Sequence, residues 1–417
     1  MRRLLTAVLA AVPALAFAPL TLAPAAQASP GVPGSTTAQA GHGHRTPYVP
    51  GVAHYSKRVC ARVPAGAAAC EAKVWTDAGG TPVANAAPAG YGPADLQGAY
   101  GLASLASSAG SGKTVAIVDA YDDPTAAQDL ATYRSTYGLP AVPSLRKVSQ
   151  TGSATALPTV DAGWAQEISL DLDMVSAACP NCSILLVEAT SASLTDLATA
   201  VNYAKAQPGV VAVSNSYGGR ESSSETTYAG SYAPGQAGQW ITASSGDSGY
   251  GAQSPAVFNT VVAVGGTSLS RASGTTRGWA ESAWSGAGSG CSAYIAATFN
   301  LSSPCGSKRA EADVSAVADP NTGVAVYDST PSAGSSGWLV FGGTSASAPL
   351  VGAVHALAAS SSSSAASLYS GASVNDVTAG SNGRCRRAVL VVCTAGPGWD
   401  GPTGVGTPNG SGGLRGF

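Results

Sequence analysis

The sequence contains few charged residues, and their signs nearly balance. Asp, Glu, Lys and Arg make up 11% of its 417 residues, and the formal net charge is −2. A nucleic-acid-binding protein needs a basic surface to neutralise phosphates, so the composition argues against that class of partner. Disorder driven by charge is also excluded, because 45% of the residues are hydrophobic and can form a core. A low charge density suits an acidic medium, in which many carboxylates are neutral.

Long hydrophobic segments are absent except at the N-terminus. Arg2 and Arg3 are followed by an apolar stretch over residues 4–22 and by Ala26-Gln27-Ala28, a small-residue cleavage site. This order predicts an export signal over residues 1–28 and a secreted protein. A membrane anchor is the alternative, but prolines interrupt the stretch and no charged stop follows it. No later segment is long and apolar enough to span a bilayer.

The eight cysteines are an even set in a chain predicted to be exported, so disulfide bonds are expected. Cys179 and Cys182 also have the spacing of a redox motif, but no thioredoxin-like strand precedes them, which favours a structural bridge. A zinc site is not expected, because no second such pair and no neighbouring histidines complete one. Proximity in the sequence suggests four local pairs: Cys60–Cys70, Cys179–Cys182, Cys291–Cys305 and Cys385–Cys393.

Secondary-structure signals divide the chain at about residue 91. Residues 29–90 are rich in Pro, Ala, Gly and Thr and have weak periodicity, which predicts a linker or a short pro-region. In residues 91–417, apolar runs typical of buried strands alternate with helical patterns. This alternation predicts an α/β fold with a mostly parallel sheet, helices on both faces and functional loops at the carboxyl ends of the strands. The expected strands cover 114–118, 183–187, 210–213, 240–243 and 261–264, and the expected helices cover 125–137, 164–178 and 193–206.

Ser345 is a candidate nucleophile. It lies in the segment FGGTSASAP over residues 341–349, which precedes an apolar helical run over residues 350–359. The glycines allow a sharp entry, and free backbone N–H groups at a helix N-terminus favour developing negative charge. Pro349 is tolerated if it lies in the first turn. An ordinary N-cap serine explains the same pattern equally well.

Histidine, the usual base for a nucleophilic serine, is scarce. Three of the four histidines, His42, His44 and His54, lie in the weakly structured leader. His355 follows Ser345 by ten residues in the same predicted helix, where a packing or surface role is expected. A Ser-His-Asp triad is therefore poorly supported, and a base has to be sought among the acids.

Two acidic motifs supply candidates. Glu167 and Asp171 are four residues apart in a predicted helix and so share one face, where proximity raises one pKa and lets the pair share a proton. The alternative is a solvated acidic face, which is the role expected of Asp173. Asp247 follows a predicted strand in a Gly-Asp-Ser-Gly loop. It is either a turn residue or, when protonated, a hydrogen-bond donor to an oxyanion.

From about residue 91 to its end, the chain resembles the sedolisin family of serine-carboxyl peptidases. The resemblance implies a subtilisin-like fold in which Ser345 attacks the substrate, Glu167 acts as base and acid, and Asp171 supports Glu167. It also implies that Asp247 donates to the oxyanion and that residues 214–219, SNSYGG, bind the substrate backbone. The motifs, in family order, are Glu167-x-x-x-Asp171, Ser245-Gly-Asp-Ser-Gly249 and Gly343-Thr-Ser-Ala-Ser-Ala-Pro349.

The C-terminal region resembles the calcium site of the same family. The resemblance implies a loop that binds one structural Ca²⁺ through oxygen atoms only, which suits a hard cation. Two glycine-rich turns with incidental acids are the alternative. The implied ligands are the carboxylates of Asp376 and Asp400 and the carbonyls of Val377, Gly396 and Gly398.

Two features depart from the family pattern. Family members usually carry a long, folded pro-domain, whereas only about sixty residues separate the predicted signal from the predicted domain. Asp119 ends a strand that resembles the one bearing the aspartate of ordinary subtilisins, but no His-Gly-Thr follows it. Asp119 is therefore left out of the catalytic set, as a secondary member of the carboxylate network or a turn former.

The sequence thus predicts a secreted serine-carboxyl peptidase, monomeric, that hydrolyses polypeptides through an acyl-enzyme on Ser345. A glutamate base, with a reference pKa of about 4.3, and a protonated Asp247 both favour acidic conditions. One alternative is a conventional subtilisin-like peptidase, which needs a histidine beside Ser345. The other is a non-catalytic extracellular binding protein that keeps the fold.

Overall fold

The computed structural model describes residues 48–358 and 362–410. The predicted export signal over residues 1–28 and the start of the predicted leader lie outside these residues. Within them, no helix is both long and apolar enough to cross a membrane.

An eight-stranded sheet forms the centre of the described chain. All of its neighbouring pairs are parallel except the pair of β11 and β12. The predicted α/β class with a mostly parallel sheet is therefore confirmed. In spatial order the strands are β12 (Trp279–Ala283), β11 (Val262–Arg271), β9 (Trp240–Ser244), β7 (Val210–Asn215), β4 (Thr114–Ala120), β6 (Ser183–Ala189) and β5 (Leu145–Ser149), and β15 (Val314–Val317) also pairs with β11.

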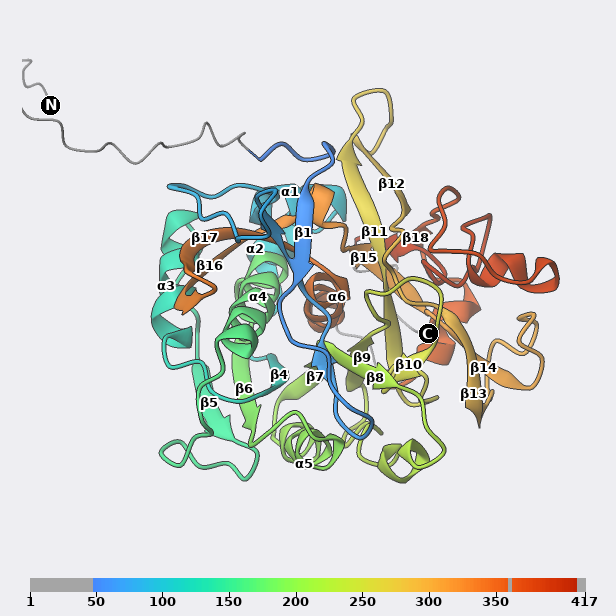
Figure 1. Ribbon diagram of the computed structural model, residues 1–417, viewed down its shortest axis with the longest axis horizontal. Helices are drawn as coiled ribbons and strands as arrows, with labels where there is room; N and C mark the ends of the chain where they lie inside the picture. The colour runs from blue at the N-terminus through green and yellow to red at the C-terminus, as the bar shows by residue number, and fades with distance from the viewer. Residues whose placement is uncertain (1–47, 359–361, 411–417) are drawn as a thin grey trace, which may run out of the picture. The chain divides into compact units, whose positions relative to one another are not determined.

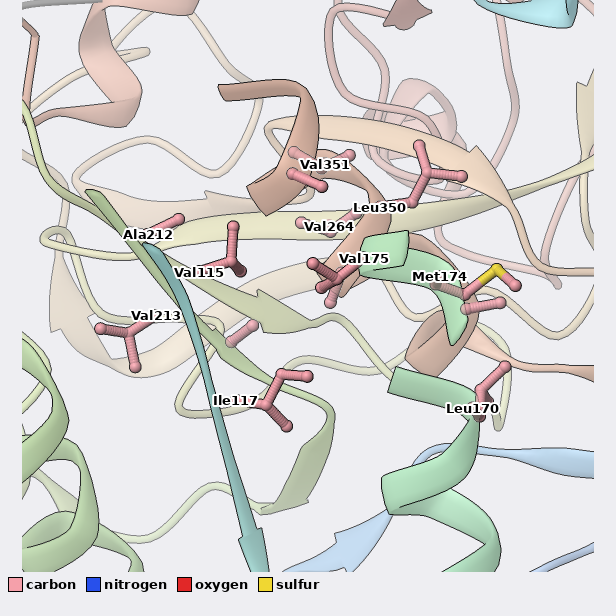
Figure 2. Packing of buried hydrophobic residues seen from close by; sticks show 14 of the residues in the cluster. Val115, Ile117, Leu170, Met174, Val175, Ala212, Val213, Val264, Leu350 and Val351 are labelled. Carbon is pink, nitrogen blue, oxygen red and sulfur yellow. The ribbon is translucent and has the colours of Figure 1, made fainter. Parts of the chain in front are cut away.

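Helices cover both faces of this sheet. On one face, α4 (Ala162–Ala178) and α6 (Thr344–Ala358) contact each other and β4, while α5 (Leu194–Lys205) contacts β4, β6 and β7 from the other side (Figure 1). Because helices cover both faces of β4, its sequence is a nearly continuous apolar run and does not alternate between apolar and polar residues. Figure 2 shows the core between sheet and helices, where Val115 and Ile117 of β4 lie near Val175 of α4.

The remaining elements surround this centre. They are α1 (Pro93–Ala99), α2 (Ala103–Ser108), α3 (Ala126–Thr136), β8 (Tyr217–Arg220), β10 (Gln253–Ser254), β13 (Gly290–Ala296), β14 (Lys308–Glu311), β16 (Val324–Ser332), β17 (Ser335–Gly342), β18 (Val374–Asn375), β19 (Thr407–Pro408) and the 3₁₀ turns Glu225–Tyr228, Pro320–Thr322, Ala365–Ser370 and Arg387–Val392.

The described part of the predicted leader is structured, which differs from the sequence-based expectation. It contains β1 (Tyr55–Arg58), β2 (Ala69–Cys70) and β3 (Lys73–Thr76). β3 pairs with β1 and β17, and β2 pairs with β8. Strands of two to four residues are too short to show periodicity, and their pairing with distant strands holds them in place. That residues 29–90 act as a pro-region remains a prediction.

Helix α6 begins beside Ser345, as expected, but Pro349 lies further into the helix than expected. It starts at Thr344, so Pro349 is its sixth residue and does not lie in the first turn. The reason is Gly343, whose φ of +107° lets the chain leave β17 and enter the helix at once. Pro349 has no N–H to donate to the carbonyl of Ser345, four residues earlier.

The four predicted disulfides, Cys60–Cys70, Cys179–Cys182, Cys291–Cys305 and Cys385–Cys393, are all present, with no free cysteine in the described chain. Cys179 and Cys182 are fully buried at the end of α4, which agrees with a structural bridge.

Candidate active site

Ser345 is the second residue of α6, so its backbone N–H has no acceptor within the helix. The side chain is fully buried, and its Oγ donates to the carbonyl of Ser216, 3.0 Å away. The two carboxyl oxygens of Glu167 have no hydrogen-bond partner in the described residues, but the Ser345 hydroxyl is near enough to act to lower the pKa of Glu167. The serine predicted as nucleophile therefore lies next to the acid predicted as its base.

Glu167 and Asp171 lie on the same face of α4, as predicted, and both are fully buried. Carboxylate oxygens of these two residues and of Asp119 lie within 4.8 Å of one another. The hydroxyl of Ser216 donates to Asp171 Oδ2 at 2.7 Å. Ser345, Glu167, Asp171 and Asp119 thus form one continuous group.

Burial dominates the electrostatics of these acids. It raises the pKa of Glu167 well above its usual range, and the neighbouring Asp171 and Asp119 raise it further. Burial and the nearby Asp119 also raise the pKa of Asp171, although its hydrogen bond from Ser216 opposes this. Burial raises the pKa of Asp119 to about 8. Like charges this close cannot all ionise, so the group holds protons that it can exchange with a hydroxyl.

Asp247 follows β9 and faces the start of α6. Its Oδ1 accepts from the backbone N–H of Thr344 at 2.8 Å and from the Thr344 hydroxyl at 3.1 Å. Its Oδ2 is buried and has no hydrogen-bond partner in the described chain. Burial raises the pKa of Asp247 to about 6, even though Lys73 and Arg58 act to lower it. Below that pH the carboxyl is protonated and can donate a hydrogen bond.

The sequence-based predictions left Asp119 out of the catalytic set and were wrong in expecting Asp173 to be solvated. Asp119 is the penultimate residue of β4 and belongs to the carboxylate group, and neither of its oxygens has a hydrogen-bond partner in the described residues. The signal that could have found it is its position at the carboxyl end of a central parallel strand. Asp173 is buried rather than solvated, because α3, α6 and β16 pack around α4, and its Oδ2 accepts from the N–H of Tyr327 at 3.0 Å.

Neither histidine in the described residues is near Ser345. His355 lies ten residues further along α6, about 15 Å away at the rise of an α-helix. Its ring stacks on Trp240 with centroids 4.1 Å apart, and its Nε2 meets the carbonyl of Gly238 at 2.8 Å. His54 stacks on Tyr48 with centroids 4.7 Å apart. Both have packing roles, while His42 and His44 lie outside the described residues.

Four of the five residues suggested as calcium ligands meet around one glycine turn. Asp376 Oδ2 accepts from the N–H of Gly398 at 3.0 Å, and Asp400 Oδ2 accepts from the N–H of Gly396 at 3.1 Å. Asp400 is fully buried, and Val377 is buried next to Asp376 in the chain. The two carboxylates therefore approach the same turn from different parts of the chain.

Comparison with known proteins found a matching family model and similar proteins. Residues 150–406 match the model of the subtilase family. Kumamolisin from Bacillus sp. (strain MN-32) is 31% identical over 369 residues, an alignment that covers 78% of this chain and 63% of kumamolisin. The chain thus spans less than two thirds of the length of that relative. The structure of Pseudomonas sedolisin, a serine-carboxyl proteinase complexed with two molecules of pseudo-iodotyrostatin, has 26% identity and a TM-score of 0.62, covering 77% of this chain and 96% of sedolisin.

The raised pKa values predict that the folded protein is most stable in acid. Asp119, with a pKa of about 8, and Asp247, with a pKa of about 6, hold protons that the unfolded chain releases near pH 4. The folded state therefore binds more protons between about pH 4 and pH 8, and stability falls as the pH rises through this window. We expect the melting temperature of the Ser345→Ala protein, used to prevent self-digestion, to drop by roughly 5 °C or more from pH 4 to pH 8.

The Asp119→Asn substitution in the same background is the comparison, because it removes one titrating group from the window and should make the decline shallower. A melting temperature that stays level or rises from pH 4 to pH 8 would contradict this account of the buried acids.

Proposed function

The chain belongs to the subtilase family and to its sedolisin group, and on this basis we propose that it is a serine-carboxyl peptidase that cleaves polypeptides through an acyl-enzyme on Ser345. The observation that carries the proposal is a buried group of three acids that Ser216 links to Ser345, because Ser216 accepts from the Ser345 hydroxyl and donates to Asp171. The coarse activity follows from the family, and the residue roles below are our assignment.

Glu167 takes the proton of the Ser345 hydroxyl as its oxygen attacks the carbonyl carbon of the peptide bond. Asp171 and Asp119 support this step by holding the shared protons, which leaves Glu167 ionised and able to accept the Ser345 proton and later release it. Glu167 then protonates the leaving amine, and water hydrolyses the ester on Ser345. A hydroxyl that now points to Ser216 has only to rotate to meet the Glu167 carboxyl.

Asp247 and the backbone N–H of Ser345 serve as the two donors to the oxyanion. The N–H points out of the first turn of α6, where the helix dipole also favours negative charge. Asp247 Oδ2 has no partner in the described chain and can donate only while protonated, below a pKa of about 6. The enzyme therefore works at acidic pH, and its activity is lost as Asp247 ionises.

Export to an oxidising compartment fits the four disulfides. We infer that the protein is secreted and acts as a monomer on extracellular polypeptides.

One structural Ca²⁺ fits the C-terminal turn. The carboxylates of Asp376 and Asp400 converge on the glycine turn and offer oxygen atoms only, as a hard cation requires. The carbonyls of Val377, Gly396 and Gly398 would complete the set. The ion would offset the repulsion between the two carboxylates and tie the turn to the β18 region, without taking part in catalysis.

Substitution at Ser345 or Glu167 tests the catalytic assignment. We expect Ser345→Ala and Glu167→Gln each to lower kcat/KM for a denatured protein at about pH 4 by at least ~10³-fold, because each removes a group that acts in the transition state. The measurement is initial-rate hydrolysis by purified protein whose fold is checked by circular dichroism.

Asp173→Asn is the matched control, since Asp173 lies on the same helix but contacts Tyr327, whose N–H an asparagine oxygen can still bind. Its folded fraction should keep wild-type kcat/KM. Full activity in Glu167→Gln, or an equal loss in well-folded Asp173→Asn, would overturn the assignment.

Substitutions at Asp247 should separate oxyanion donation from simple packing. Asp247→Ala removes the donor and should lower kcat by about 10²–10³-fold. Asp247→Asn keeps an acceptor for Thr344 and has an amide N–H that donates at any pH. We expect it to retain more activity than the alanine variant and to lose the decline in rate near pH 6, which a pH–rate profile from pH 3 to 8 will measure. An unchanged decline in Asp247→Asn would show that another group controls it.

Chelation should destabilise the protein if the C-terminal turn binds Ca²⁺. With an excess of EGTA at pH 6, we expect the melting temperature to fall by several degrees and to recover on addition of Ca²⁺, because an ion that binds only the folded state stabilises it. The Asp376→Asn variant should have a lower melting temperature before any treatment, and this temperature should change less on addition of EGTA or Ca²⁺. Identical melting curves with EGTA and with Ca²⁺ would rule out the site.

A further inference from the structure

A second group of buried acids lies outside the candidate active site. Asp123 follows β4, Asp129 is in the first turn of α3, and Asp328 belongs to β16, which lies beside α3 (Figure 1). Each of these residues places a carboxylate oxygen within 4.8 Å of the other two. All three residues are 0–1% exposed. Distant parts of the chain thus bring three buried carboxylates together.

No cationic side chain balances these acids. Within the residues that the structure describes, no lysine or arginine forms an ion pair with any of the three. Lys147 comes close, but its Nζ pairs with the carboxylates of Asp122 and Glu188 and donates to the backbone carbonyl of Asp123 at 2.6 Å. Buried charges of one sign are strongly unfavourable, so the group must bind either protons or a cation.

Two carboxylate oxygens of the group have no partner. Across residues 48–358 and 362–410, nothing donates a hydrogen bond to the buried oxygens Asp129 Oδ1 and Asp328 Oδ2. The second oxygen of each carboxylate is fixed, because Asp129 Oδ2 accepts from the N–H of Ser329 at 2.8 Å and Asp328 Oδ1 accepts from the N–H of Thr330 at 2.9 Å. Buried polar atoms without a partner are rare, and a cation bound between the carboxylates would satisfy both oxygens.

The surroundings of the group offer further oxygen atoms. The hydroxyls of Thr125 and Thr330 are 2.9 Å apart, and they lie 3.0 Å and 3.3 Å from Asp123 Oδ1. The Thr125 hydroxyl is also 2.6 Å from Asp129 Oδ2. Oxygen ligands suit hard divalent cations. Mg²⁺ demands a near-ideal octahedron and usually keeps several waters, so a buried and irregular set of oxygens favours Ca²⁺.

We propose that Asp123, Asp129 and Asp328 bind one Ca²⁺ between the end of β4, α3 and β16. The free oxygens of Asp129 and Asp328 and an oxygen of Asp123 supply the charged ligands. The ion offsets most of the repulsion among the three carboxylates and ties three segments of the chain together. This site is separate from the C-terminal calcium site, and it is independent of the proposed peptidase function.

The proposed ion is linked to the candidate active site through α4. Asp123 follows Asp119 by four residues, just beyond the carboxyl end of β4. The hydroxyl of Ser169 donates to Asp123 Oδ2 at 3.4 Å, and Ser169 lies between Glu167 and Asp171 on α4. An ion on Asp123 therefore holds the chain after β4 against α4, and it supports the catalytic acids without touching them.

Counting bound calcium in a set of variants tests the site. The protein is the full chain with Ser345→Ala, which is equilibrated with Ca²⁺ at about pH 6 and freed of unbound ion by gel filtration before elemental mass spectrometry. We expect two ions per chain, one for this site and one for the C-terminal turn. Asp328→Asn and Asp376→Asn should each lower the count to one, because each removes a charged ligand, and the double variant should bind none.

Asp173→Asn is the matched control. Asp173 is a buried acid beside the group, but its Oδ2 accepts from the N–H of Tyr327, the residue before Asp328, at 3.0 Å. It lies outside the ligand set, so its variant should keep two ions.

Hydrogen exchange then locates the ion in the chain. In Asp376→Asn, removal of Ca²⁺ with EGTA should increase the exchange rate several-fold in residues 121–130 and 324–332 and leave residues 395–408 unchanged, because only the first two segments carry the proposed ligands.

The counts separate this site from the C-terminal one. A single ion that is lost in Asp376→Asn and kept in Asp328→Asn overturns the inference and leaves the C-terminal site standing, whereas the reverse pattern supports the inference and overturns the C-terminal site. Two ions that persist in Asp328→Asn and Asp129→Asn also overturn it, and Asp129→Asn alone decides if Asp328→Asn does not fold. No bound calcium in any variant means that the acids share protons instead and overturns both sites. Mg²⁺ that displaces Ca²⁺ at equal concentration overturns the choice of ion.

Discussion

The site depends on enclosing several carboxyl groups around one serine. Charges this close together in an interior of low dielectric constant cannot all ionise, so the acids must share protons. Burial thereby gives a carboxyl group the property that histidine has in other serine peptidases, a pKa high enough to exchange a proton with a hydroxyl. The same burial couples folding and chemistry to acidic solution, because the folded state binds protons that the unfolded state releases.

Two packed helices and two strand ends bring these groups together. α4 carries Glu167 and Asp171, and it packs on α6, which carries Ser345 at its N-terminus. Asp119 lies near the end of β4 and Asp247 follows β9, at the carboxyl edge of the parallel sheet. Each of these side chains is thus carried by a helix or strand of the packed core, or by the residues directly after one. The core therefore sets their relative positions.

Features set by local pattern were predicted from the sequence, and features set by distant pairing were not. The i, i+4 spacing placed Glu167 and Asp171 on one face, and short loops identified the disulfide partners. Asp119 joins the carboxylate group only because β4 packs against α4. The residues around Asp119 in the sequence give no sign of this packing. β3 has four residues and exists because β17, far along the chain, pairs with it. The sharp entry to α6 was predicted, because it follows from the local backbone of Gly343.

Two cations of the N-terminal strands act on Asp247. Arg58 of β1 and Lys73 of β3 both act to lower its pKa, and the Nζ of Lys73 donates to the Asp247 carbonyl at 3.0 Å. Burial alone raises the pKa of Asp119 to about 8, whereas these cations and the hydrogen bonds from Thr344 limit the pKa of Asp247 to about 6. Asp247 therefore ionises before Asp119 as the pH rises, so the acid that we assign as oxyanion donor sets the upper limit of the acidic working range.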